Sequence, residues 1–236
     1  MMSNMKRLLA AVLFLMVSVP VRADTRKGSS TLSLFGGLGF SSSRYELGVT
    51  GGEEPVARGG GTFGGQWVYY FQESPSYGIG LDASGTHLSD RRTTDLVRGA
   101  DTTSYLNSNV LLVIMKLSYP TGRVRPYVFG GVGAHHSHTF VSGMPYGGNT
   151  WSDTHTSENR VLLDETHKSL ALGGGIGLEM YLTEQLFIGA EYRGVMLAHK
   201  RYEETPAAAS AGLVFQKSDL DVQSLLLSIG VKFGPS

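Results

Sequence analysis

The chain has 236 residues, with 20 basic and 20 acidic side chains and no cysteine. The lack of cysteine excludes disulfides, thiolate catalysis and cysteine-ligated zinc, and the balanced charge does not indicate a nucleic-acid partner. The length suits a single all-β barrel domain.

The first 23 residues have the parts of a secretory signal peptide. Lys6 and Arg7 give a positive start, an apolar segment runs from Leu8 to Val19, and Val21-Arg22-Ala23 is a small-residue cleavage pattern. The apolar segment is short for a bilayer span, so we expect cleavage before Asp24 and one domain over residues 24–236. Cleavage removes three of the 20 basic residues and no acidic residue, which leaves a formal charge of −3.

Eight later segments alternate apolar and polar residues with the period of two of a half-buried strand. From Leu170 to Leu182, the even-numbered residues are mostly large and apolar, whereas the odd-numbered ones are mostly small. Together with the loop lengths and the composition of the polar face described below, the pattern predicts an all-β fold, an eight-stranded antiparallel up-and-down transmembrane β-barrel. The expected strands are residues 31–40, 62–71, 77–86, about 105–119, a fifth from 125 onward, 170–182, 186–193 and about 220–233.

The breaks between these strands alternate in length. Short breaks at 72–76, 120–124 and 183–185 separate long polar ones at 41–61, 87–104, 139–167 and 203–218. Outer-membrane barrels show this alternation, with the short turns on the periplasmic side. The 32 glycines, many of them inside strands, also suit a small barrel, whose sheet curves sharply around a narrow lumen.

Alternation alone does not say which face is outside, because a soluble calyx would turn the apolar row inward. The polar row here consists mostly of glycine, serine and alanine with isolated charges, which suits a narrow lumen where each ion needs a partner. We therefore expect the apolar row to face lipid. The candidates for lumen ion pairs are Asp82, Lys116, Glu179, Glu191, Arg193 and Lys232.

Aromatic residues gather near both ends of the expected strands, which is typical of the two girdles of a membrane barrel. Phe40, Phe63, Tyr105, Phe140 and Tyr202 lie near the long loops. The girdle expected at the short-turn ends comprises Trp67, Tyr69, Phe71, Tyr77, Tyr119, Tyr127, Tyr181, Phe187 and Phe233.

The glycine-rich strands resemble the small eight-stranded outer-membrane β-barrel family that includes the OmpA transmembrane domain. The resemblance covers the mature chain and is carried by Arg125-Pro126-Tyr127 before Gly130–Gly133, by Gly173–Glu179 and by Gly189–Arg193. It implies a Gram-negative outer-membrane location, contact with outer-membrane lipid and lipopolysaccharide, and assembly by the barrel-assembly machinery. We expect no cofactor.

The favoured hypothesis is a non-enzymatic barrel with a structural or surface-interaction role and a lumen plugged by ion pairs. The alternative is a narrow channel, or a lateral transporter of small apolar molecules like the OmpW-like relatives. Charged loop residues could meet a surface ligand or could simply be solvated. These loop residues are Glu53, Glu54, Arg91, Arg92 and Arg98.

Five histidines lie around the long break at 139–167, at His135, His136, His138, His155 and His167. Imidazoles at such spacing can bind a transition metal, but alternation separates His135 from the next two, and we expect polar boundary residues without a metal. A third hypothesis is enzymatic, because His135 and Ser137 resemble the His-x-Ser of lipid A deacylases. The asparagine of that motif is His138 here, and no glutamate can be assigned to orient the ring, so this is the least favoured hypothesis.

Overall fold

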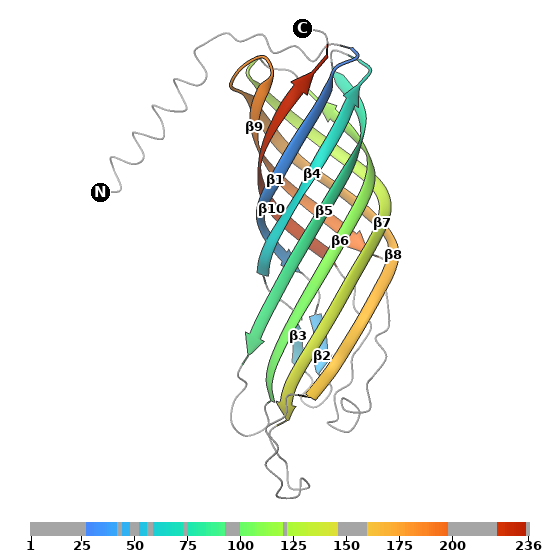
Figure 1. Cartoon of the computed structure of the whole chain (residues 1–236), viewed down its shortest axis with the longest axis vertical. Coiled ribbons are helices and arrows are strands. Elements are labelled where there is room, and N and C mark those ends of the chain that lie inside the picture. Colours follow the sequence, from blue (N-terminus) through green and yellow to red (C-terminus); the bar gives the residue numbers. More distant parts are fainter. Residues whose placement is uncertain are drawn as a thin grey trace, which may run out of the picture.

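The computed structural model describes residues 27–41, 44–47, 52–55, 59–72, 75–92, 100–119, 122–145, 160–197 and 221–234. Eight antiparallel strands close into a barrel in the order β1-β10-β9-β8-β7-β6-β5-β4 (Figure 1). The strands of the barrel are β1 (Ser30–Ser41), β4 (Gly59–Tyr70), β5 (Ser76–Arg92), β6 (Ala100–Ser118), β7 (Val124–Pro145), β8 (Arg160–Tyr181), β9 (Leu186–Leu197) and β10 (Asp221–Phe233).

The strand register fixes the tilt of the barrel. A path across the pairings that starts at Ser30 on β1 passes through every strand and returns to β1 at Phe40, ten residues further along. A closed sheet with this stagger must tilt its strands against the barrel axis, by about 35–45°. The tilt brings side chains from distant parts of the chain to one level in the lumen.

The short connections use local turn chemistry. In the β8–β9 turn, the Thr183 hydroxyl accepts hydrogen bonds from the backbone N–H groups of Gln185 at 3.2 Å and Leu186 at 2.9 Å. In the β6–β7 turn, Gly122 has φ of +76°, a conformation that side chains disfavour. The first strand begins and the last strand ends at this same end of the barrel (Figure 1).

The strands around the long connections are longer than expected. β5 continues to Arg92 and β6 begins at Ala100, where the sequence predicted a loop over 87–104. β7 likewise extends to Pro145 and β8 starts at Arg160, within the loop predicted at 139–167. Loss of apolar alternation marks the end of the membrane band rather than the end of strand pairing, so these loop boundaries were wrong. β5 to β8 extend beyond the other strands (Figure 1).

A further strand pair lies in the predicted loop at 41–61. β2 (Arg44–Leu47) pairs antiparallel with β3 (Gly52–Pro55) in a separate two-stranded sheet. Within the ranges that the structure describes, no helix is long and apolar enough to cross a membrane.

The two faces of the barrel differ as the alternation predicted. Leu172 and Leu227 point outward with 60% and 71% of their surface exposed, whereas Glu191 and Lys232 are inside with 7% each. Exposed apolar residues continue around all eight strands, which makes an apolar outer band.

Three residues expected in the short-turn girdle lie inside the barrel instead. Tyr127, Tyr181 and Phe187 are 7%, 1% and 1% exposed. Tyr181 and Phe187 occupy inward positions of β8 and β9, as Glu179 and Glu191 do, so strand parity overrides their position near the strand ends. Tyr77 is partly exposed, and the remaining members are exposed at the outer surface: Trp67, Tyr69, Phe71, Tyr119 and Phe233.

Candidate functional site

A charged network fills the middle of the lumen. Arg193 on β9 binds Asp82 on β5 with two hydrogen bonds, Nη1 to Oδ1 at 2.8 Å and Nη2 to Oδ2 at 3.1 Å. The same guanidinium binds Glu191 through Nε and Nη2, both at 2.5 Å from Oε1. All three residues are at most 7% exposed. The guanidinium is thus held between two carboxylates in the geometry that suits its planar fork.

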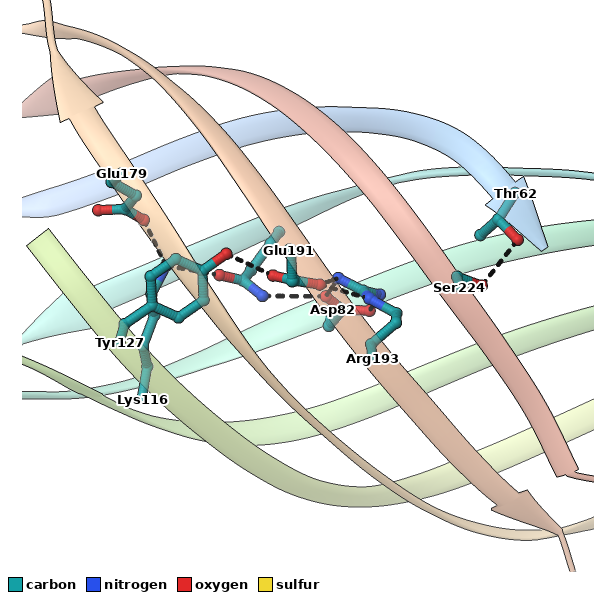
Figure 2. Close-up of polar contacts among 9 residues, drawn as sticks. Thr62, Asp82, Lys116, Tyr127, Glu179, Glu191, Arg193 and Ser224 are labelled. Atoms are coloured by element: carbon teal, nitrogen blue, oxygen red, sulfur yellow. Dashed lines mark hydrogen bonds and ion pairs between the residues drawn. The ribbon is translucent and has the colours of Figure 1, made fainter. Parts of the chain in front are cut away.

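A second ion pair extends the network toward the short turns. The Lys116 ammonium on β6 lies 2.5 Å from a carboxylate oxygen of Glu179 on β8. Gln66 on β4 joins the two pairs, because it accepts from Lys116 at 3.1 Å and donates to Asp82 at 3.1 Å. The Tyr127 hydroxyl donates to Glu191 at 2.6 Å. Figure 2 shows these contacts following one another along the barrel.

Aromatic rings cover the cations of the network. The Arg193 guanidinium lies 4.1 Å from the ring centre of Phe35 and 5.4 Å from that of Phe129. Lys116 Nζ lies 3.8 Å from the ring centre of Tyr127. Such rings attract cations and exclude water from them, so the ions depend on each other for solvation.

Two more cations lie closer to the short turns. Arg125 is 1% exposed, with its guanidinium 4.3 Å from the ring centre of Tyr181. Lys232, the sixth lumen candidate, is also buried there, and its backbone N–H donates to the carbonyl of Gln185 at 2.7 Å. The lumen residues expected from the sequence did not include Gln66, Tyr127 or Arg125, although each occupies an inward position by strand parity.

In the long-loop half of the lumen, the buried residues that the structure describes include no acidic or basic side chain other than His135. This half contains an apolar cluster and, on the β10–β1–β4–β5 side, three linked hydroxyls. Thr62 contacts Thr86 and Ser224, each at 3.0 Å, and the latter contact passes over Gly39, where a Cβ would lie 2.6 Å from the Thr62 hydroxyl. The apolar cluster includes Leu88, Leu106, Val110, Leu112, Ile114, Ala171, Val195 and Val222.

The sheet separates the predicted histidine cluster. His135 points inward and is 2% exposed, whereas His136 is exposed on the outer face and His138 lies 2.7 Å from Asp164. Among the described residues, no group of three or more metal-ligating side chains could hold a metal ion. His155 lies outside the described residues.

The histidine and serine of the enzymatic hypothesis both face the lumen. His135 and Ser137 are 2% and 3% exposed. The described contacts of the His135 ring are to the hydroxyls of Ser108 at 3.1 Å and Ser169 at 3.2 Å. Both ring nitrogens of His135 therefore contact hydroxyls other than that of Ser137. In this arrangement His135 is not placed to take a proton from Ser137.

The charged loop residues are only partly placed. Glu53 and Glu54 belong to β3, and Arg91 and Arg92 belong to β5. Arg98, Tyr202 and the expected signal peptide lie outside the described residues. The structure therefore describes no side-chain contacts of the loop residues on which the surface-ligand hypothesis is based.

A family model of the outer membrane protein beta-barrel domain matches residues 9–233. The chain belongs to the outer-membrane β-barrel family. This confirms the predicted family and the location in the Gram-negative outer membrane, and the structure confirms the eight-stranded antiparallel barrel. No curated protein matches the chain by sequence.

Solved structures of other outer-membrane barrels are similar to this family member. OprG from Pseudomonas aeruginosa is 15% identical with a TM-score of 0.54, over 91% of this chain and 100% of OprG. Ail from Yersinia pestis, in complex with the heparin analogue sucrose octasulfate, is 14% identical with a TM-score of 0.46, over 88% and 100%. The N-terminal barrel domain of Pseudomonas aeruginosa OprF is 19% identical with a TM-score of 0.38, over 88% and 98%. At these identities, the likeness to OprG shows the fold alone.

Proposed function

We propose that this protein is a non-enzymatic outer-membrane barrel with a structural or surface-interaction role, whose lumen is plugged by its ion-pair network. The observation that carries the proposal is the bond between Arg193 and Asp82, which joins opposite walls of the barrel. Further hydrogen bonds flank this bond along the lumen, from Lys116 to Gln66 and from Tyr127 to Glu191. A hydrated ion would have to break these bonds to pass.

The energetics of buried charges support a plug. Removing one partner of a buried ion pair leaves the other without solvation, which costs about 3–5 kcal/mol. Spontaneous opening of both Arg193 and Lys116 from their carboxylates would be more costly still, so the closed arrangement dominates at equilibrium. The role of the barrel then lies in its outer wall and its loops, toward lipid, lipopolysaccharide or an unknown surface ligand.

Planar-bilayer recording of the full mature chain tests the plug. We expect the wild type to give rare and small currents, and Arg193→Ala combined with Lys116→Ala to raise the open fraction severalfold. Tyr192→Phe on the outer wall is the matched control and should behave as the wild type. A wild type that conducts as steadily as the double variant would overturn the plug.

The alternative transport function has one observation in its favour. The long-loop half of the lumen is lined by buried apolar residues such as Leu106, Leu112 and Val110, which would suit a small apolar molecule. Because Lys116 of the charged network lies on β6 between this cluster and the short turns, such a molecule would have to leave through the barrel wall. Uptake of a small apolar dye into vesicles discriminates the two functions, since transport predicts uptake that Leu112→Glu abolishes and a plug predicts none.

The proposal includes the biogenesis that the family resemblance implies. The signal peptide of residues 1–23 would direct export, and the barrel-assembly machinery would insert residues 24–236 into the membrane. We expect the protein itself to bind no cofactor, metal or nucleic acid. An unchanged lipid A mass spectrum after overexpression is expected, and loss of an acyl chain that depends on Ser137 would contradict the non-enzymatic role.

A further inference from the structure

The outer face of β6, β7 and β8 changes character abruptly from one row of side chains to the next. The register places Leu111, Ala134 and Leu170 side by side in one outward row, and all three are exposed. In the next outward row, Asn109, His136 and Lys168 lie side by side. His136 and Lys168 are directly paired and both exposed. Over a distance of two residues along each strand, the outer surface thus changes from apolar to polar, and the polar row includes the ammonium of Lys168.

Two further rows continue on the extended part of these strands. Asn107, His138 and Thr166 form the first, and Tyr105, Phe140 and Asp164 form the second. The rings of Tyr105 and Phe140 stack with their centres 4.9 Å apart and an interplanar angle of 18°. Asp164 binds His138 at 2.7 Å. His87 also stacks on Tyr105, with ring centres 6.4 Å apart, so the ring edges and the Tyr105 hydroxyl remain for a ligand. Together with the neighbouring amide, imidazole and carboxylate groups, they suit the apolar faces and hydroxyls of sugar rings.

Of these four rows, the apolar row, the row with Lys168 and the row with Tyr105 follow the chemical order of a single lipid. We propose that this wall binds one lipopolysaccharide molecule of the outer leaflet. Its acyl chains lie on the row of Leu111, Ala134 and Leu170, a phosphate meets Lys168 and His136, and its sugars lie against Tyr105 and Phe140. This inference deepens the proposed surface role and rests on the membrane orientation of the barrel, with the long loops outside.

The position and charge of the rows favour this occupant. The rows are continuous with the apolar band that already faces the membrane, so a bound molecule must come from the same leaflet. Asp164 is four residues from Lys168 along β8, roughly 13 Å, and its carboxylate is engaged by His138. It therefore does not neutralise the cationic row.

The opposite wall lacks such a row. In the described parts of β1, β9 and β10, the outward residues at this end are Phe40, Met196 and Gln223, all exposed. None of the three carries a positive charge. The proposed site is thus confined to one side of the barrel, which provides an internal control.

Titration of the full mature chain in phosphatidylcholine nanodiscs tests the proposal with four probes. These are bisphosphorylated lipid A, dephosphorylated lipid A, lipopolysaccharide with core sugars, and phosphatidylglycerol. The phosphate-row variant is Lys168→Gln with His136→Gln, and the sugar-row variant is Tyr105→Ala with Phe140→Ala. The control, Gln223→Ala with Tyr192→Phe, changes the opposite wall. Heat-modifiable migration in gels verifies that each variant is folded.

We expect the phosphate-row variant to bind bisphosphorylated lipid A about five- to tenfold more weakly, from the loss of the Lys168 charge and of the His136 imidazole contact. Its binding of dephosphorylated lipid A should not change. The sugar-row variant should lose the preference for core-bearing lipopolysaccharide over lipid A. Three results would each overturn the proposal. The phosphate-row variant could bind lipid A as tightly as the wild type, the control could lose as much lipid A affinity as the phosphate-row variant, or the wild type could bind phosphatidylglycerol as tightly as lipid A. None of these outcomes affects the conductance test, so a failure here is distinguishable from a failure of the plug.

Discussion

Arg193 and Asp82 are 111 positions apart in the chain, yet their side chains share two hydrogen bonds across the lumen. Arg193 is on β9 and Asp82 on β5, and four steps around the ring of eight strands separate them in either direction. The pair therefore joins diametrically opposite walls. Since the register of every intervening strand must be correct for the bond to form, it tests closure of the whole barrel.

This cross-brace predicts a large loss of stability when it is broken. Arg193→Ala leaves Asp82 and Glu191 buried together without a counter-ion, and we expect the free energy of unfolding to fall by about 3–5 kcal/mol. Urea titration in detergent or vesicles measures it. Glu184→Ala in the exposed β8–β9 turn is the control, with a change within about 0.5 kcal/mol. Equal effects of the two substitutions would refute the brace.

The Tyr127 hydroxyl has a role that its ring does not. Tyr127→Phe keeps the ring beside Lys116 but removes the donor that lies 2.6 Å from Glu191. The buried carboxylate loses one hydrogen bond, so we expect a destabilisation of about 1–3 kcal/mol. The effect should vanish in a Glu191→Gln background, as a double-mutant cycle would reveal. A persistent effect there would mean that the hydroxyl acts on another group.

Two strand glycines should respond differently to the same added methyl group. At Gly133 a Cβ would overlap the backbone carbonyl of Leu111 on β6, whereas at Gly194 no atom lies within 4 Å. We expect Gly133→Ala to cost about 1–3 kcal/mol and Gly194→Ala to be nearly neutral. The fraction that refolds to the heat-modifiable form measures both. Similar refolding of the two variants would argue against close strand approach at Gly133.

The lipid-facing assignment of the apolar row can be tested with a charge. Leu227 is outward on β10, far from the strand ends, and Leu227→Arg should destabilise the barrel by about 2–4 kcal/mol in vesicles. Gln223 lies on the same face of the same strand but near the long-loop end, where an added arginine should destabilise the barrel by only about 0–1 kcal/mol. If the arginine at 227 were tolerated as well as that at 223, the depth of these residues would be misassigned.

Export should remove the signal peptide. We expect the chain isolated from outer membranes to begin at Asp24, because Ala23 ends the small-residue cleavage pattern. Intact-mass measurement gives the cleavage site directly. Arg substitutions within Leu8–Val19 should leave precursor in the cytoplasm. A membrane form that retains Met1 would show that the segment acts as an anchor.

Much of this architecture could be read from local sequence. Side-chain alternation has the period of the strand itself, so the faces of Leu172 and Glu191 were predictable before any pairing was known. The turn at Thr183–Gln185 was also predictable, because a tight turn depends on a few consecutive residues. The strand ends beyond Thr86 and before His167 were not, since pairing continues after the apolar signal ends.

What the sequence determined by itself is thus the barrel class, the number of strands in the barrel and the inward face of most strands, although it assigned three aromatic residues to the wrong side of the wall. Only the tertiary structure decided that Arg193 binds Asp82 as well as its strand neighbour Glu191, and that Tyr127 and Tyr181 lie in the lumen beside charged groups. The reason is geometric. Contacts across a lumen depend on the stagger accumulated over eight pairings, and no local pattern along one strand carries that sum.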